Sequence, residues 1–141
     1  MDKTGRKETE YTNLKQIEYQ LSVLSEDCPS LDCDAMAYCS SVALRKAGIQ
    51  HKLKRGYVFD NKTGDIVIPH VWITTDSGYV VDYRLQKWLG EHDRVPHGLF
   101  FASDFARVSY IGEVLETGAD VDIEEIAYHL TDGNMEMYTH G

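Results

Sequence analysis

The chain has 141 residues, of which 43% are hydrophobic and 26% are charged, and its formal net charge is −9. This length suits a single domain over residues 1–141, and the acidic balance argues against general binding to nucleic acids or anionic membranes. No apolar run is long enough to cross a bilayer, and the first residues lack the apolar core of a signal peptide. We therefore expect a cytoplasmic protein whose three cysteines are free thiols.

Two helices are predicted in the first third of the chain. Apolar residues at three- and four-residue steps predict an amphipathic helix over residues 10–26. The residues of this stripe are Tyr11, Leu14, Ile17, Leu21 and Leu24. A second helix is expected over residues 33–47, with Ser30 or Asp32 as its N-cap and Gly48 after its end. Because it is apolar on most sides, we expect it to be a buried central helix.

Alternating apolar residues follow, and they predict three strands over residues 53–59, 66–74 and 79–85. Pro69 indicates a bulge or an edge position in the second strand. Residues 75–78 have the composition of a hairpin loop. These features predict a small antiparallel sheet after the two helices.

The last part of the chain has weaker patterns. Residues 86–104 contain glycine and proline and are expected to be irregular. Helices are predicted over residues 106–116 and 123–131, and the second of these has Asp122 as its N-cap and Gly133 after its end.

Charge is distributed unevenly along the chain. Five cations lie within eleven residues, and no lysine or arginine follows Arg107. The clustered cations are Arg45, Lys46, Lys52, Lys54 and Arg55. One interpretation is two solvated faces of opposite sign. The other is a basic rim that recruits an acidic substrate or docks the acidic C-terminal part.

Cys33 has three possible roles: metal ligand, core residue or nucleophile. Cys28, Cys33 and Cys39 lack the short paired spacing of zinc sites, so we expect no metal. Cys28 and Cys39 are assigned to structural positions. Cys33 instead falls in the first turn of the central helix, where free N–H groups and the helix dipole favour a thiolate. Asp32 and Asp34 oppose that charge, so a nearby cation is required.

The segment PHVWITTDSGYVVDYR supplies such a cation. His70 lies on the second predicted strand and Asp82 on the third. A loop of residues 75–77 places these two side chains directly opposite each other. Asp82 then orients His70 and stabilises an imidazolium beside Cys33. His97, in the loop RVPHGLF, is a rival base or a residue that lines the cleft.

Together these residues resemble the transglutaminase-like cysteine enzymes. The run CDAMAYCSSVALRKAGI from Cys33 is similar to the nucleophile helix of that family, with methionine in place of its more usual aromatic residue. HVW from His70 resembles the family's His-x-Trp strand, and VVDY around Asp82 resembles the strand that follows. The family's glycine two residues before the cysteine is Leu31 here. Order and gaps agree over residues 31–84.

The resemblance implies an α+β fold with a papain-like core, in which N-terminal helices pack on a small antiparallel sheet. This core covers about residues 10–85. Residues 86–141 then form a variable flank with a C-terminal helix, and this flank shapes the choice of substrate.

The resemblance also implies roles for individual residues. Cys33 is the nucleophile, His70 the base and Asp82 the orienting acid, with no cofactor or metal. Trp72 packs beside the site, and Trp72 and His97 are the expected substrate-binding residues. The expected activity is acyl transfer from a peptide or protein through a thioester, most simply as a peptidase or amidase. Transglutaminase or glutamine deamidase activity, or a non-catalytic binding module, remain open alternatives.

A thioester mechanism needs donors for the oxyanion. The backbone N–H of Cys33 is one expected donor. The sequence does not identify the second donor, and side chains of the first helix, such as Gln16, Tyr19 or Gln20, are candidates.

Overall fold

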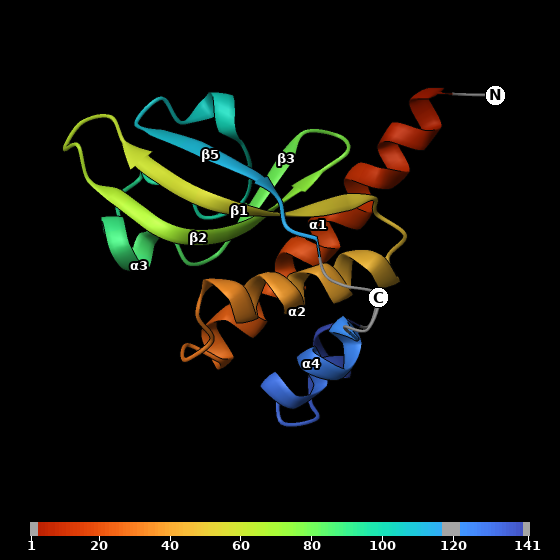
Figure 1. Cartoon of the computed structure of the whole chain (residues 1–141). Helices are drawn as coiled ribbons and strands as arrows, with labels where there is room; N and C mark the ends of the chain where they lie inside the picture. The colour runs from red at the N-terminus through yellow and green to blue at the C-terminus, as the bar shows by residue number, and fades with distance from the viewer. Residues whose placement is uncertain (1–2, 117–121, 140–141) are drawn as a thin grey trace.

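The computed structural model describes the backbone of residues 3–116 and 122–139, and side chains from residue 13 onward (Figure 1). N-terminal helices pack on a five-stranded antiparallel open sheet, so the fold is α+β. The elements in chain order are α1 (Lys3–Asp27), α2 (Cys33–Lys46), β1 (His51–Asp60), β2 (Ile66–Thr75), β3 (Tyr79–Asp82), α3 (Gln86–Leu89), β4 (Gly98–Phe101), η1 (Ala102–Asp104), β5 (Val108–Val114), α4 (Ile123–Leu130) and η2 (Met135–Tyr138). None of the helices described has the length and apolar character needed to span a membrane.

The two predicted N-terminal helices are confirmed. The Asp32 side chain caps α2 by accepting a hydrogen bond from the backbone N–H of Ala35 at 3.0 Å. Gly48, with a φ of 75°, follows the end of the helix, as a C-terminal glycine commonly does. The predicted stripe of α1 is buried from Leu14 to Leu24, whereas the side chain of Tyr11 lies outside the described residues.

The strand order is β4-β3-β2-β1-β5. Two predictions for the last part of the chain are wrong. Residues 98–101, expected to be irregular, form β4 and pair with β3. Residues 108–114, expected within a helix, form β5 and pair with β1 over its whole length. In both cases the hydrogen-bond partner is a strand far away in the sequence, so local pattern does not reveal the pairing.

Gly112 allows β5 to lie close against the rest of the sheet. A Cβ atom at this position would lie 2.6 Å from the Trp72 side chain and 2.6 Å from the backbone oxygen of Arg55. Gly112 pairs with Gly56 on β1, so both strands lack a side chain at the point of contact. The backbones therefore approach closely over the indole of Trp72.

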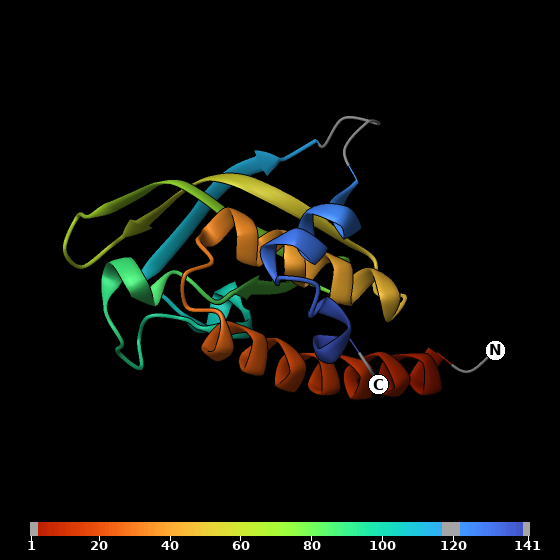
Figure 2. The same ribbon diagram turned by 90° about the horizontal axis from the view of Figure 1, so that it is seen from below.

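The two faces of the sheet carry different cores. Val71, Ile73 and Val81 face the buried sides of α1 and α2. Trp72 and Val80 belong to a separate cluster on the opposite face. Figure 2 shows the helical layer crossing one face of the sheet. The opposite face, which carries Trp72 and Val80, is covered by residues that follow β3 in the chain.

The predicted helix over residues 123–131 is confirmed as α4. Asp122 caps it by accepting hydrogen bonds from the backbone N–H groups of Glu124 and Glu125. Ile123 and Ala127 are buried in the same core as α2, and α4 lies on the side of α2 away from the sheet (Figures 1 and 2). This part of the acidic segment is thus an outer layer of the helical side.

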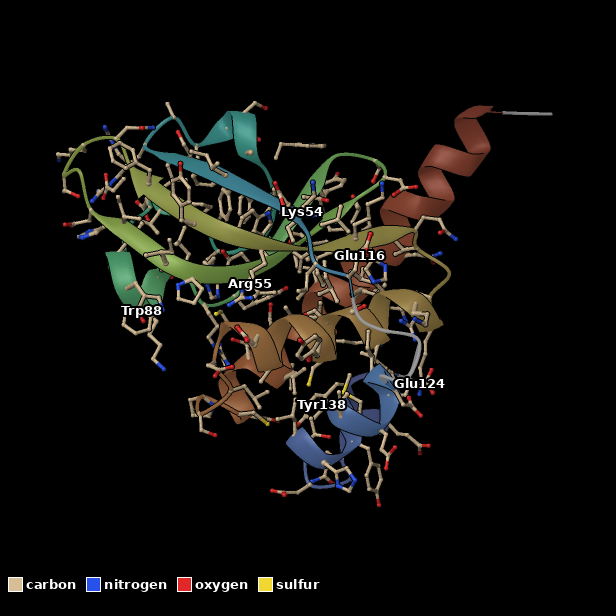
Figure 3. The ribbon with its side chains drawn as sticks, viewed as in Figure 1. Lys54, Arg55, Trp88, Glu116, Glu124 and Tyr138 are labelled. Atoms are coloured by element: carbon tan, nitrogen blue, oxygen red, sulfur yellow. The ribbon has the colours of Figure 1, made fainter. Side chains whose placement is uncertain are left out.

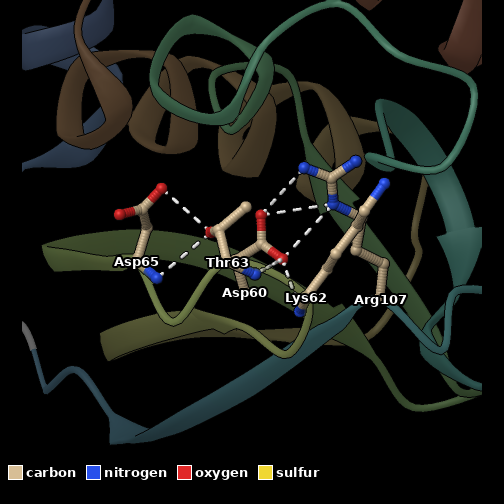
Figure 4. A network of polar contacts seen from close by, with 5 residues as sticks. All are labelled: Asp60, Lys62, Thr63, Asp65 and Arg107. Atoms are coloured by element: carbon tan, nitrogen blue, oxygen red, sulfur yellow. Dashed lines mark hydrogen bonds and ion pairs between the residues drawn. The ribbon is translucent and has the colours of Figure 1, made fainter.

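An ion pair between Arg107 and the buried carboxylate of Asp60 stabilises the turn between β1 and β2. The Arg107 Nη2 atom lies 3.0 Å from Asp60 Oδ2, and Asp60 also accepts hydrogen bonds from the backbone N–H groups of Lys62 and Thr63 (Figure 4). The hydrogen bond from Arg107 lowers the pKa of Asp60 to about 2. This network joins the hairpin to the residue just before β5.

Candidate active site

Cys33 is the first residue of α2 and is half-buried. Its backbone N–H lies in the first turn, where no intrahelical acceptor exists. The thiol donates to Asp34 Oδ1 at 3.2 Å. Cys39, two turns further along, is fully buried, and burial together with the charge of Cys28 raises its pKa to about 12. Cys39 is therefore a core residue, as the sequence predicts.

His70 and Asp82 are both buried and are hydrogen-bonded to each other. His70 Nε2 lies 2.7 Å from Asp82 Oδ2, so the predicted contact is present. The predicted register is wrong by two residues, because Ile73 pairs with Val81, which places Trp72 rather than His70 across from Asp82. His70 is a diagonal neighbour on the same face, within reach of a long side chain.

Asp82 accepts four hydrogen bonds, which fix both of its oxygens. Oδ1 accepts the backbone N–H groups of Arg84 at 2.9 Å and Leu85 at 3.1 Å. Oδ2 accepts from His70 and from the Tyr110 hydroxyl, the latter at 2.8 Å. The carboxyl group therefore has one orientation, with its acceptor atom aimed at the imidazole.

Sequence reasoning missed Tyr110. It lies on β5, in the segment expected to be a helix, and only the pairing of β5 with β1 brings its hydroxyl to Asp82. Burial raises the pKa of Tyr110 well above its ordinary value, and the nearby Asp82 raises it further. Tyr110 thus stays protonated and acts as a donor to the carboxylate.

The imidazole of His70 interacts with Cys33 as well as with Asp82. Burial alone lowers the pKa of His70, but hydrogen bonds and charge from Asp82 and Cys33 outweigh it and raise the pKa to about 9. Nδ1 is buried, and among the described residues it makes no hydrogen bond of ordinary geometry. Because Nε2 is bonded to Asp82, Nδ1 is the ring nitrogen left for the thiol. Such contacts are often loose before substrate binds.

A second observation brings Cys33 close to the end of β3. Cys33 and Asp82 line the same small cavity, of about 10 Å³, together with Val71 and Tyr83. The paired part of β2 and β3 covers only Ile73–Thr74 and Val80–Val81. The strands thus separate where α2 begins, which lets a residue of the helical layer reach a residue on the opposite face of the sheet.

Trp72 and His97, the expected substrate-binding residues, occupy different environments. Trp72 is 3% exposed, with its ring centroid 6.1 Å from that of His70 and 5.0 Å from that of Tyr110. It therefore packs behind the imidazole and has little surface left for a substrate. His97 is exposed on one side, and its ring lies edge-on to Tyr83 with centroids 5.2 Å apart. Burial lowers the pKa of His97, partly offset by the nearby Asp82.

The expected second oxyanion donors are placed differently from the prediction. Gln16 and Gln20 line a cavity of about 190 Å³ with Ala43 and Lys46. Ala43 is ten residues after Cys33, which is roughly 15 Å along the helix. These two glutamines are thus at the wrong end of α2. Tyr19 is 73% exposed on α1.

An exposed aromatic residue lies on the short helix next to the start of α2. Trp88 is 63% exposed and projects from α3 into solvent (Figure 3). α3 lies beside the beginning of α2 in both ribbon views (Figures 1 and 2). Trp88 lies in the segment that was predicted to be irregular, and the composition of that segment did not indicate a function.

No family model, no curated protein and no solved structure matches this chain. Among the described residues, no three His, Cys, Asp or Glu side chains are grouped as metal ligands. The chemistry of the site is therefore argued from a thiol at a helix N-terminus, an imidazole and a carboxylate.

Proposed function

We propose that the chain is a cysteine-dependent acyl-transfer enzyme that hydrolyses an amide or ester bond in a peptide or protein. The observation that carries this proposal is the buried His70–Asp82 pair, whose second ring nitrogen is left for Cys33. The three groups come from α2, β2 and β3, and we assign them the roles of nucleophile, base and orienting acid. A papain-like, transglutaminase-like core is proposed on the same basis, together with the motifs around these residues.

The proposed acylation step begins from a thiolate–imidazolium pair of Cys33 and His70. The Cys33 thiolate attacks the substrate carbonyl carbon, and the new oxyanion accepts a hydrogen bond from the Cys33 backbone N–H. When the tetrahedral intermediate collapses, the C–N bond breaks and the His70 imidazolium gives its proton to the leaving amine. A thioester and a neutral imidazole result.

Deacylation reverses the proton transfer. Neutral His70 takes a proton from water while the water oxygen attacks the thioester carbonyl. The C–S bond then breaks, which releases a carboxylic acid and restores the thiolate–imidazolium pair. Throughout, Asp82 holds the Nε2 side of the ring and stabilises its positive charge.

The test of this proposal is site-resolved alkylation by iodoacetamide. We expect Cys33 to react well below pH 8.5, where ordinary thiols react slowly, because His70 stabilises its anion. Mass spectrometry of the three cysteine peptides gives each rate in the same sample. Cys28 is the internal control, since it is half-buried in a loop. Equal pH profiles for Cys28 and Cys33 would contradict the proposal and favour a non-catalytic binding module.

Hydrolysis is expected to outpace transfer to amines, which separates a hydrolase from a transglutaminase. A transferase must exclude water from its thioester, and the described residues around Cys33 enclose only about 10 Å³. The measurement supplies a nitrophenyl ester as acyl donor and varies a primary amine at fixed pH, with Cys33→Ala as the background control. If amide were the main product at millimolar amine, the assignment would move to transglutaminase.

A further inference from the structure

Arg84 is a buried cation that binds the chain just before the nucleophile. It is 7% exposed and follows the end of β3. Its guanidinium donates to the backbone oxygens of Leu31 and Cys28, to the Ser25 hydroxyl at 2.6 Å and to the Ser25 and Tyr83 backbone oxygens. Thus most of its acceptors lie in the last turn of α1 and in the loop between α1 and α2.

Within the described part of the chain, no carboxylate lies within ion-pair distance of Arg84. Its side-chain hydrogen bonds all go to oxygens of carbonyl and hydroxyl groups, and the charges of Asp82 and Asp32 act on it only from a greater distance. Burying a cation in this way is costly, and a buried ionic group is a weak source of stability. A cation near the C-terminus of α1 is favoured by the helix dipole, but that alone does not require contacts as far along as Leu31.

The backbone of the same residue contacts the other half of the site. The N–H of Arg84 donates to Asp82 Oδ1 at 2.9 Å, and Asp82 Oδ2 binds His70. Arg84 thus joins the acid that orients the base to the loop that ends at Asp32 and Cys33. It also lines the small cavity that Cys33 and Asp82 share.

We propose that Arg84 is a positioning residue that fixes the thiol of Cys33 relative to the imidazole of His70. The proposal rests on the function proposed above. The backbone N–H of Arg84 orients Asp82, and its guanidinium holds the loop from which α2 starts. The distance between nucleophile and base is therefore set by one side chain that spans from the sheet to the helical layer.

The geometry explains why this position is arginine. A guanidinium has five donors in a rigid plane, and here they reach acceptors on separate residues. Lysine keeps the charge but carries its donors on one atom, so it cannot hold Leu31 and Ser25 together. A misplacement of about 1 Å in an active site can cost about 10²-fold in rate.

Arg84→Lys tests the proposal through the pH profile of Cys33 alkylation. We expect the rate at about pH 6 to fall by about 10- to 100-fold, and the profile to move toward that of Cys28. The charged and titratable groups that face the pair are Asp34 on α2, Asp82 on β3, Tyr110 on β5 and His97 before β4. None of them is changed by the substitution, so the shift reports the separation of thiol and imidazole.

Arg107→Lys is the matched control. Arg107 also makes several side-chain hydrogen bonds to a buried group, but that group is Asp60 at the hairpin turn (Figure 4). We expect this variant to lose thermal stability and to keep the wild-type alkylation profile. If Arg84→Lys likewise lowered the melting temperature without moving the profile, its role would be structural only and the inference would be overturned.

If Arg84→Lys does not fold, Ser25→Ala tests the same role of Arg84. It removes one acceptor of the guanidinium and leaves those of Cys28 and Leu31. We expect a smaller shift of the profile in the same direction, and an unmoved profile counts against the inference. The wild-type profile separates the proposed function from the proposed role of Arg84. If Cys33 is not alkylated rapidly in the wild type, both proposals fail. If it is alkylated rapidly and neither Arg84→Lys nor Ser25→Ala changes the rate, only the role of Arg84 is overturned.

Discussion

Cys33→Ala is expected to abolish turnover and covalent labelling, with a loss of about 10³-fold or more in rate. The reason is that in the proposed mechanism the thiol forms the bond to substrate, and no other group of the site replaces it. Because the side chain is half-buried at the first position of α2, we expect the melting temperature to change by only about 2 °C. Hydrolysis of an activated ester and differential scanning calorimetry measure the two effects.

Cys39→Ala is the matched control on the same helix. Cys39 is fully buried in the core between α2 and its neighbours, so its truncation should cost about 1–2 kcal/mol of unfolding free energy. We expect this variant to retain activity below its melting temperature. Loss of activity in Cys39→Ala, with activity retained in Cys33→Ala, would show that the wrong thiol has been assigned.

His70→Asn is expected to lower turnover by about 10²- to 10⁴-fold, the usual contribution of a positioned acid–base group. It is also expected to change how stability depends on pH. The pKa of His70 is raised from 6.5 to about 9 in the folded chain. The imidazolium therefore contributes stability that is fully present below about pH 6.5 and is lost as the pH rises through 9.

The expected size of this effect follows from the shift in pKa. A rise from 6.5 to about 9 corresponds to about 3 kcal/mol, which urea unfolding at about pH 6 and pH 9.5 should detect in the wild type. In His70→Asn most of this decrease should disappear, which leaves only the smaller decrease near pH 9.5 that the raised pKa of Cys39 produces. An equal decrease in the variant would contradict the assignment of His70 as the buried imidazolium.

His51→Asn is the control for the second prediction. His51 bonds Ser41 at 2.7 Å and the backbone oxygen of Ile49 at 2.8 Å, on the far end of α2. Burial lowers its pKa, so its contribution to stability is lost as the pH falls below about 6.5, the opposite sense to His70. The variant should therefore keep the decrease in stability above that pH.

The parts of the fold that sequence predicted are those with local causes. Asp32 and Gly48 delimit α2 because capping and a left-handed terminator act within one turn. The segment of β5 has apolar residues at Val108, Ile111 and Leu115, a spacing that is also compatible with a helix. Its pairing with β1, from Asp60↔Val108 to Lys54↔Val114, makes it a strand instead, and these partners lie more than a third of the chain apart. The periodicity of apolar residues carries no information about a strand partner that is so distant in the sequence.

The same division applies to the site. Cys33, His70 and Asp82 lie in short motifs whose residue types suggest their chemistry. The register between β2 and β3 differs from the predicted one by two residues, since the loop residues allow either alignment. Tyr110 and Arg84 reach the site only through strand pairing and helix packing. The residues next to Tyr110 and Arg84 in the sequence therefore do not predict their contacts with Asp82 and Leu31.

Cys33, the proposed nucleophile, belongs to the helical layer, whereas His70, the proposed base, lies on the far face of the sheet with Trp72. The site therefore lies at the interface between the helical layer and the sheet. The relative position of Cys33 and His70 depends on how firmly α2 packs on the strands. We expect a small shift of α2 on the strands, without any unfolding, to separate the thiol from the imidazole. The alkylation rate of Cys33 should therefore report how tightly the helical layer packs on the sheet, even where secondary structure does not change.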